Sequence, residues 1–261
     1  EMALAYHNRG FAYAAIGQYD KALRDFDECL RLAPGTANAY HNRGFCSTAQ
    51  GEYDRALQDY DAELKIRPRF AFGYYNRGFV RVAQGDFDKA KDDFTMAIQL
   101  RPNFTDAYYN RGDVHRAKGN YDQAVADYGE SIRHDPQFML AYYHRGEVFH
   151  ETGQFDRAIA DFDALVKLHP ALAAAYNSRG LAYTAKHEHD RAITDFGEAI
   201  RLQPRYAGAY NSRAAAHAAK GDYERAMVDH IEAIRLDPKV ADVFDNFARL
   251  WVAEAGGKDA S

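Results

Sequence analysis

The spacing of the prolines limits what this chain can fold into more than any other feature. The 261 residues contain seven prolines, and each lies 34 residues after the one before it. Their positions are Pro34, Pro68, Pro102, Pro136, Pro170, Pro204 and Pro238. Other segments repeat in step, so that Tyr6-His7-Asn8-Arg9-Gly10 returns as Tyr40-His41-Asn42-Arg43-Gly44 and in later copies. A constant period of this length indicates tandem copies of one supersecondary unit.

Each copy is predicted to be a pair of helices. In the first copy, Tyr6, Gly10 and Tyr13 lie three or four residues apart, which places them on one face of a helix. The alanine, phenylalanine and cysteine that follow have the same helical spacing. Gly17 interrupts the register between the two sets, where a left-handed turn is favourable only for glycine. Pro34 then ends the second helix, because proline cannot continue the hydrogen-bond ladder.

The copies resemble the tetratricopeptide repeat. The Tyr-x2-Arg-Gly-x2-Tyr, Ala-x3-Phe and Pro spacings follow the pattern of that family, with arginine where the family has leucine. The resemblance implies an all-α fold, a right-handed α-solenoid of antiparallel helix hairpins in a single array over residues 1–254. One hairpin cannot bury its apolar faces alone, so the copies are expected to stack. The predicted repeats are 3–36, 37–70, 71–104, 105–138, 139–172, 173–206 and 207–240.

A further helix is predicted to follow the last repeat. Residues 241–254 have one apolar side, which includes Phe244, Phe247 and Trp251, and one polar side. We expect this segment to cap the open end of the array. The Gly-rich, polar tail 255–261 is expected to be disordered.

One arginine and one aspartate never vary between copies, and they lie sixteen residues apart. An arginine on the inner side of the first helix is costly to bury unless it is paired, and the aspartate beside the core aromatic is its natural partner. We therefore predict structural ion pairs, although arginines exposed to catch an acidic ligand are the alternative. The pairs are Arg9 and Asp25, Arg43 and Asp59, Arg77 and Asp93, Arg111 and Asp127, Arg145 and Asp161, Arg179 and Asp195, and Arg213 and Asp229.

The resemblance implies that the first helices of the hairpins line a concave, ligand-binding surface. Residues on the exposed side of these helices differ along the chain. The first four copies carry an asparagine ladder, Asn8, Asn42, Asn76 and Asn110. Beside it lie a phenylalanine stripe, Phe11, Phe45 and Phe79, and the tyrosines Tyr75 and Tyr109, which are also expected to be exposed.

An asparagine amide presents both a donor and acceptors, so a row of amides can hold an extended backbone while the phenylalanines form apolar pockets. The ladder resembles that on the peptide-binding superhelix of O-GlcNAc transferase, although this chain has no transferase domain. The alternative is that asparagine is simply the usual residue at this position of the repeat. The clamp with which other tetratricopeptide proteins hold the acidic C-termini of heat-shock chaperones is not expected, because Leu4, Asn38, Phe72 and Asp106 occupy its lysine positions.

Other classes of site find little support in the sequence. The net charge is −5, and acidic and basic residues are mixed along the sequence. The sequence therefore gives no basic patch of the kind that binds nucleic acid or an anionic membrane. Cys29 and Cys46 make neither a disulfide framework nor a zinc site, and His187-Glu188-His189 lacks an evident third metal ligand. No phosphate loop or nucleophile elbow is present. We therefore expect no enzyme, cofactor, metal site or membrane insertion and, since no secretory signal is recognisable at the start, a cytoplasmic location.

These patterns favour a non-catalytic scaffold that binds an extended segment of another protein or peptide along the first helices. Two alternatives stay open. The chain could be a self-assembling element that builds a homo-oligomer, or a regulatory module of a larger enzyme or secretion-related protein. Solenoids of one architecture differ in their ligands, so the partner's identity does not follow from the repeat.

Overall fold

The computed structural model describes residues 1–240, which form fourteen α-helices, one short 3-10 helix and no strand. The helices are α1 (Met2–Ala15), α2 (Tyr19–Leu32), α3 (Ala37–Ala49), α4 (Tyr53–Ile66), α5 (Ala71–Ala83), α6 (Phe87–Leu100), α7 (Thr105–Ala117), α8 (Tyr121–His134), α9 (Met139–Glu151), α10 (Phe155–Leu168), α11 (Ala173–Ala185), α12 (His189–Leu202), α13 (Ala207–Ala219) and α14 (Tyr223–Leu236), followed by η1 (Pro238–Val240).

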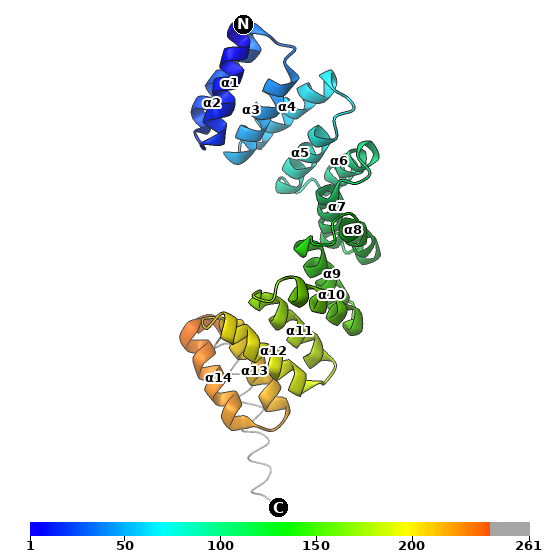
Figure 1. Ribbon diagram of the computed structural model, residues 1–261, viewed down its shortest axis with the longest axis vertical. Coiled ribbons are helices and arrows are strands. Elements are labelled where there is room, and N and C mark those ends of the chain that lie inside the picture. Colours follow the sequence, from blue (N-terminus) through cyan, green and yellow to red (C-terminus); the bar gives the residue numbers. More distant parts are fainter. Residues whose placement is uncertain (241–261) are drawn as a thin grey trace, which may run out of the picture. The chain divides into compact units, whose positions relative to one another are not determined.

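The helices form consecutive antiparallel pairs within two compact units, Glu1–Phe138 and Met139–Ser261 (Figure 1). We call the odd-numbered helices A helices and the even-numbered ones B helices. Each A helix packs against the B helix that follows it, and inside each unit each B helix also packs against the next A helix. The predicted all-α fold, a solenoid of helix hairpins, is therefore confirmed.

The two helices of a hairpin approach closely because glycine faces an aromatic ring. A Cβ atom on Gly10 would lie 3.0 Å from the Phe26 ring, and one on Gly180 would lie 2.6 Å from Phe196. These rings are completely buried. The large ring fills the space that the missing side chain leaves, so the residue pair sets the distance between A and B helices.

The turns inside the hairpins depend on a left-handed residue. Gly17 has a φ of +73°, and the corresponding glycines of most other hairpins are alike. The α11–α12 turn instead places His187 at a φ of +59°, which is uncommon for a residue with a side chain. The predicted role of glycine is confirmed, and His187 is its exception. Each B helix ends two residues before the repeated proline, as Leu32 does before Pro34.

The predicted capping helix 241–254 and tail 255–261 lie outside the described residues. The helix that a cap would cover, α14, differs from the other B helices on its outer side. Val228 and Ile231 are 68% and 60% exposed. At the same two positions of its hairpin, α2 carries Arg24 and Asp27. The last B helix therefore presents an apolar surface where an earlier one is charged.

Deleting residues 241–261 is expected to leave this surface without a cover and to make the chain associate. Light scattering after size-exclusion chromatography at several concentrations would measure the association. The matched control is the same deletion with Val228→Arg and Ile231→Asp, which should remain monomeric. A simple deletion variant that is monomeric and as stable as the parent would rule out the cap.

Candidate polypeptide-binding surface

Three positions on each A helix of the first unit share one helix face, because they are separated by four and three residues. We call this set the A-helix face. It consists of Leu4, Asn8 and Phe11 on α1, Asn38, Asn42 and Phe45 on α3, Phe72, Asn76 and Phe79 on α5, and Asp106, Asn110 and Asp113 on α7. Neighbouring A helices contact each other, so these rows lie side by side.

Three of the four side-chain amides of the asparagine ladder, those of Asn42, Asn76 and Asn110, are oriented by rings from the preceding hairpin. Asn42 Nδ2 lies 3.2 Å from His7 Nε2, and Asn76 Nδ2 lies 3.5 Å from His41 Nε2. An amide nitrogen only donates, so both ring nitrogens accept and the proton of each ring is on Nδ1. His41 Nδ1 accordingly donates to the fully buried Glu63 carboxylate at 2.9 Å. The Oδ1 atom and one N–H of each of these two amides remain available for a ligand.

The fourth asparagine has fewer free hydrogen-bonding groups than the sequence suggests. Asn110 Nδ2 donates to the Tyr75 hydroxyl at 3.1 Å and to the Asp106 carbonyl at 2.8 Å. These bonds use both of its N–H groups, so at this level the ladder presents only an acceptor. The expectation that every amide offers both functions is wrong for Asn110, because its neighbours satisfy the donors.

The phenylalanine stripe is open to solvent. Phe11, Phe45 and Phe79 are 58%, 52% and 49% exposed, which is unusual for three large apolar side chains in a row. The phenylalanine stripe ends at α7, which carries the acidic Asp113 at this position. Asp113 accepts a hydrogen bond of 2.7 Å from the Tyr128 hydroxyl. The exposed apolar surface therefore belongs to α1, α3 and α5.

The expectation that Tyr75 and Tyr109 are exposed is wrong, since both are half-buried. The Tyr75 ring packs against Phe104 with centroids 4.8 Å apart, and Tyr109 packs against Phe138 at 5.3 Å. Burial raises the pKa of both hydroxyls. Their rings fill the space between hairpins because the residue before each asparagine points sideways along the array, which repeat spacing alone did not show.

The second unit does not continue the ladder. At the asparagine position it has His144, Ser178 and Ser212, and Ser178 is buried. One residue earlier, the Oδ1 atoms of Asn177 and Asn211 are buried without a hydrogen-bond partner among the described residues. The second unit therefore differs from the first in residue type at this position, and at Ser178 also in burial.

Every invariant arginine contacts the aspartate sixteen residues later. The Nε atom donates to that carboxylate in all seven cases, and the shortest of these bonds are 2.7 Å in length, from Arg9 to Asp25 and from Arg213 to Asp229. Six of the arginine side chains are 16–24% exposed, whereas Arg9 on the first helix is 59% exposed. Their repeated geometry and buried carboxylates support a structural role rather than ligand capture.

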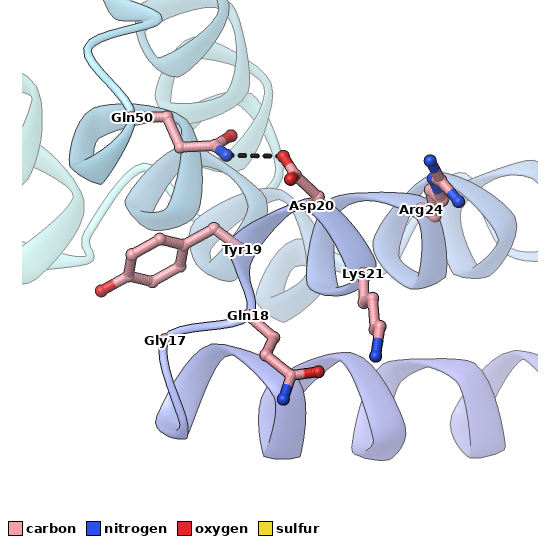
Figure 2. A pocket seen from close by; sticks show the side chains of 7 residues that line it. All are labelled: Gly17, Gln18, Tyr19, Asp20, Lys21, Arg24 and Gln50. Carbon is pink, nitrogen blue, oxygen red and sulfur yellow. Dashed lines mark hydrogen bonds between the residues drawn. The ribbon is translucent and has the colours of Figure 1, made fainter.

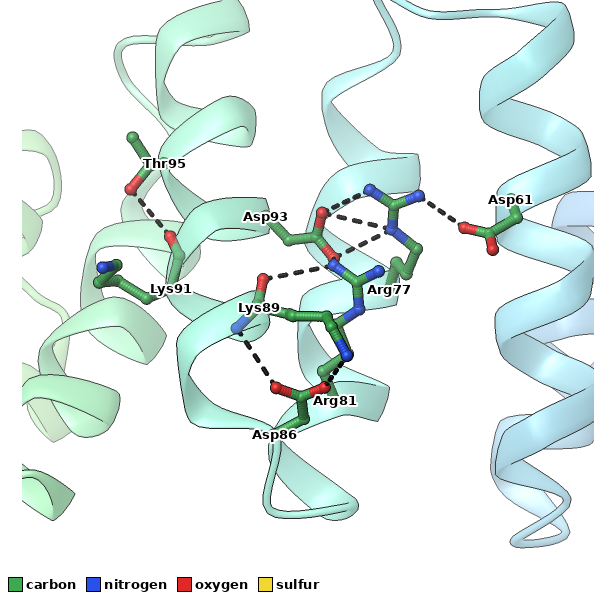
Figure 3. A network of polar contacts seen from close by, with 8 residues as sticks. All are labelled: Asp61, Arg77, Arg81, Asp86, Lys89, Lys91, Asp93 and Thr95. Atoms are coloured by element: carbon green, nitrogen blue, oxygen red, sulfur yellow. Dashed lines mark hydrogen bonds and ion pairs between the residues drawn. The ribbon is translucent and has the colours of Figure 1, made fainter.

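Three of the seven arginines also bind a second carboxylate, which the sequence reasoning missed. Arg77 Nη1 donates to Asp61 of the preceding hairpin at 2.6 Å, while its other nitrogens bind Asp93 (Figure 3). Arg81 contacts the same Asp93 carboxylate at 2.7 Å. Arg43 and Arg179 make the corresponding bonds to Asp27 and Asp163. The sequence contains the signal for this contact, which is an acidic residue sixteen positions before the arginine. The resulting ion pair links adjacent hairpins.

A hollow outside the A-helix face has no evident binding role. A hollow of about 420 Å³ lies at the α1–α2 turn and is lined by Gln18, Tyr19, Lys21, Arg24 and neighbours (Figure 2). The Gln50 side chain at its rim donates to Asp20 at 2.7 Å and ties α3 to α2, as Gln84 and Asp54 do one hairpin later. We interpret this rim as part of the contact between hairpins. Within residues 1–240, no three metal-binding side chains come together, and no helix has the length and apolar character needed to cross a membrane.

Comparisons with known families agree with this architecture. Profiles described as tetratricopeptide repeat match residues 1–69, 71–104, 94–126 and 207–240, and a profile described as TPR repeat matches 112–153, 146–187 and 180–221. These matches extend over nearly all of the described chain. The chain belongs to the tetratricopeptide repeat family. Proteins with this repeat generally serve as scaffolds for protein–protein interaction and are typically non-catalytic.

Solved TPR structures are similar to the chain over most of its length. The C-terminal part of a TPR protein from Cytophaga hutchinsonii has a TM-score of 0.80 at 17% identity and covers 92% of this chain and 98% of its own, which shows the shared fold. YrrB, described as a TPR protein with an unusual peptide-binding site, has a TM-score of 0.62 at 25% identity, covering 75% and 97%. MamA has a TM-score of 0.60 at 25% identity, covering 66% and 94%. No curated protein sequence matches the chain.

Proposed function

We propose that this TPR protein is a non-catalytic scaffold that binds an extended polypeptide segment along the A-helix face of its first unit. The observation that carries the proposal is the coincidence of the asparagine ladder with the exposed phenylalanine stripe on the same three helices. The ladder offers Oδ1 acceptors at four successive levels. Asn8, Asn42 and Asn76 add donors, so peptide N–H and C=O groups both find partners.

The orientation of the amides supports a site rather than a chance row of polar residues. His7 and His41 hold the amides of Asn42 and Asn76 before any ligand arrives, which reduces the ordering that binding requires. Backbone recognition by amides tolerates any sequence, while the phenylalanine stripe would select apolar side chains at intervals of one hairpin. The peptide-binding site described for YrrB gives a precedent in a related TPR protein.

The proposal is tested with peptides selected from a displayed library of random linear sequences on the full chain. For one selected synthetic peptide, Asn42→Ala and Asn76→Ala together should weaken binding roughly tenfold or more, because each lost hydrogen bond contributes on the order of 1 kcal/mol. Isothermal titration calorimetry would give the affinities.

Ser212→Ala is the matched control, since Ser212 occupies the asparagine position in the second unit. It should leave the affinity unchanged, and circular dichroism should show that both variants are folded. Equal losses in the two variants would extend the site over the whole array. An unchanged affinity in the double variant would place the peptide on another surface.

A further inference from the structure

Two arginines at the same repeat position, Arg67 and Arg101, differ in how their charge is satisfied. Each directly follows a B helix, Arg67 after α4 and Arg101 after α6. Both guanidinium groups lie over the phenylalanine of the connection that follows, Phe70 for Arg67 and Phe104 for Arg101. Arg101 also lies over Phe72 of α5, the A helix of its own hairpin. The chain therefore contains an internal comparison of one geometry with two different sets of neighbours.

Arg67 is neutralised within its own unit. Its guanidinium lies 4.1 Å from the centre of the Phe70 ring. One nitrogen, Nη2, donates to the buried Glu63 carboxylate, and Nη1 donates to Asn38 Oδ1 at 2.9 Å. A bound segment would therefore find little free charge at this level.

Arg101 has lost both of these polar neighbours. Ala97 stands where the preceding hairpin has Glu63, and Phe72 stands where it has Asn38. The Arg101 guanidinium lies 5.2 Å from the centre of the Phe72 ring and 5.1 Å from that of Phe104. Its polar contact is a long bond of 3.4 Å from Nε to Asn103 Oδ1.

No carboxylate among residues 1–240 forms an ion pair with Arg101, including Asp106, the acid closest to it along the chain. A guanidinium stacked on aromatic rings keeps its donor edges in a defined plane. Arg101 is consequently an oriented cation with unused donors.

The contact with Phe72 places the charge of Arg101 at the edge of the A-helix face. Phe72, which it contacts, is 42% exposed and shares the face of α5 with Asn76 and Phe79. The Phe72 and Phe104 rings meet edge to face with centroids 5.0 Å apart. None of the twelve residues of the A-helix face is basic, so Arg101 supplies positive charge at the edge of a surface that otherwise lacks it.

We infer that Arg101 and Phe72 form a subsite for a carboxylate-bearing residue of the bound segment, adjacent to an apolar residue of the same segment. The inference rests on the proposed binding of a polypeptide along the A-helix face. The carboxylate accepts paired hydrogen bonds from the Arg101 guanidinium, and the apolar residue packs on the exposed part of Phe72. The carboxylate belongs either to an aspartate or glutamate side chain or to the C-terminus of the segment.

The test compares peptides that the full-length wild-type chain and its Arg101→Gln variant select from the same random library. Wild-type selections should share an acidic residue, or a free C-terminus, next to an apolar residue. For one selected peptide, Arg101→Gln should weaken binding about tenfold, as should replacing the peptide's acid by its amide. Both changes remove the same interaction, between the Arg101 guanidinium and the carboxylate of the peptide. The two losses of binding free energy should therefore not add.

Three further measurements separate this role from a general effect of charge. Arg24→Gln makes the same charge change on the exposed side of α2 and should leave affinity unchanged. Asp106→Asn removes a neighbouring negative charge and should strengthen binding of acidic peptides. Amidation of the peptide's C-terminus identifies the source of the carboxylate, because it weakens binding only if the terminus occupies the subsite.

The outcomes distinguish this inference from the function on which it rests. Peptides that depend on Asn42 and Asn76 but bind Arg101→Gln as tightly as the wild type would overturn the subsite and retain the groove. Fully additive losses, or selected peptides with no acid and no free C-terminus, would do the same. A library that yields no peptide dependent on these asparagines would overturn both proposals.

Discussion

Asp127→Ala is expected to lower the free energy of unfolding by about 3–5 kcal/mol, because it leaves a mostly buried guanidinium without a carboxylate. Arg111 is 19% exposed, and its Nε and Nη2 atoms both bind Asp127. After the substitution its remaining hydrogen bond from Nη1 goes to the neutral hydroxyl of Thr95 at 3.1 Å. Urea unfolding monitored by circular dichroism would measure the loss.

Asp25→Ala is the matched control at the same repeat position. Its partner Arg9 is 59% exposed, so water can solvate the guanidinium once the carboxylate is gone. This substitution should cost much less than Asp127→Ala. Equal costs in the two variants would mean that the pairing matters little and that the aspartate side chain acts through packing alone.

The Arg77–Asp93 ion pair is not expected to be more stabilising than an apolar contact of the same shape. Burial raises the pKa of the Asp93 carboxyl, although the Arg77 and Arg81 guanidinium groups face it. A raised pKa in the folded state means that the ionised carboxylate is less favourable there than in the unfolded chain. For Asp127→Ala, the expected cost comes from leaving the Arg111 guanidinium without a carboxylate, because removing one partner of a buried ion pair costs more than the pair itself contributes.

Gly180→Val is expected to destabilise the second unit by about 1–3 kcal/mol through overpacking. A Cβ atom on Gly180 would lie 2.6 Å from Cε1 of Phe196, whose ring is completely buried. The buried Phe196 ring cannot move aside, so α11 and α12 must separate to make room for the valine side chain. Thermal and urea unfolding would report the loss.

The last hairpin shows how this clash can be avoided. There the glycine is replaced by Ala214, and the aromatic ring opposite is replaced by the smaller His230. A double-mutant cycle with Gly180→Ala and Phe196→His should therefore give a favourable coupling energy, since the pair reproduces a combination that the chain already uses. Losses that simply add would show that the two residues do not set the helix separation together.

Much of this architecture follows from the sequence by itself. The 34-residue period, the glycine turn and the proline determine where each hairpin begins and ends, because these local signals act over a few residues. Six of the A helices begin at the first residue of the repeat that the period predicts, from Ala37 to Ala207. The residue types of the asparagine ladder and the phenylalanine stripe were also evident, since helical spacing assigns them to one face.

Only the tertiary structure decided which polar groups on that face are free. The rings of His7 and His41 orient amides 35 residues away, and Asn110 loses both donors to Tyr75 and Asp106. The second carboxylate that Arg43, Arg77 and Arg179 bind depends in the same way on contacts between hairpins, as does the unpaired charge of Arg101. Repeat spacing defines which residues are equivalent, but hydrogen bonding and burial depend on the neighbours that stacking brings together, so equivalent residues acquire different roles.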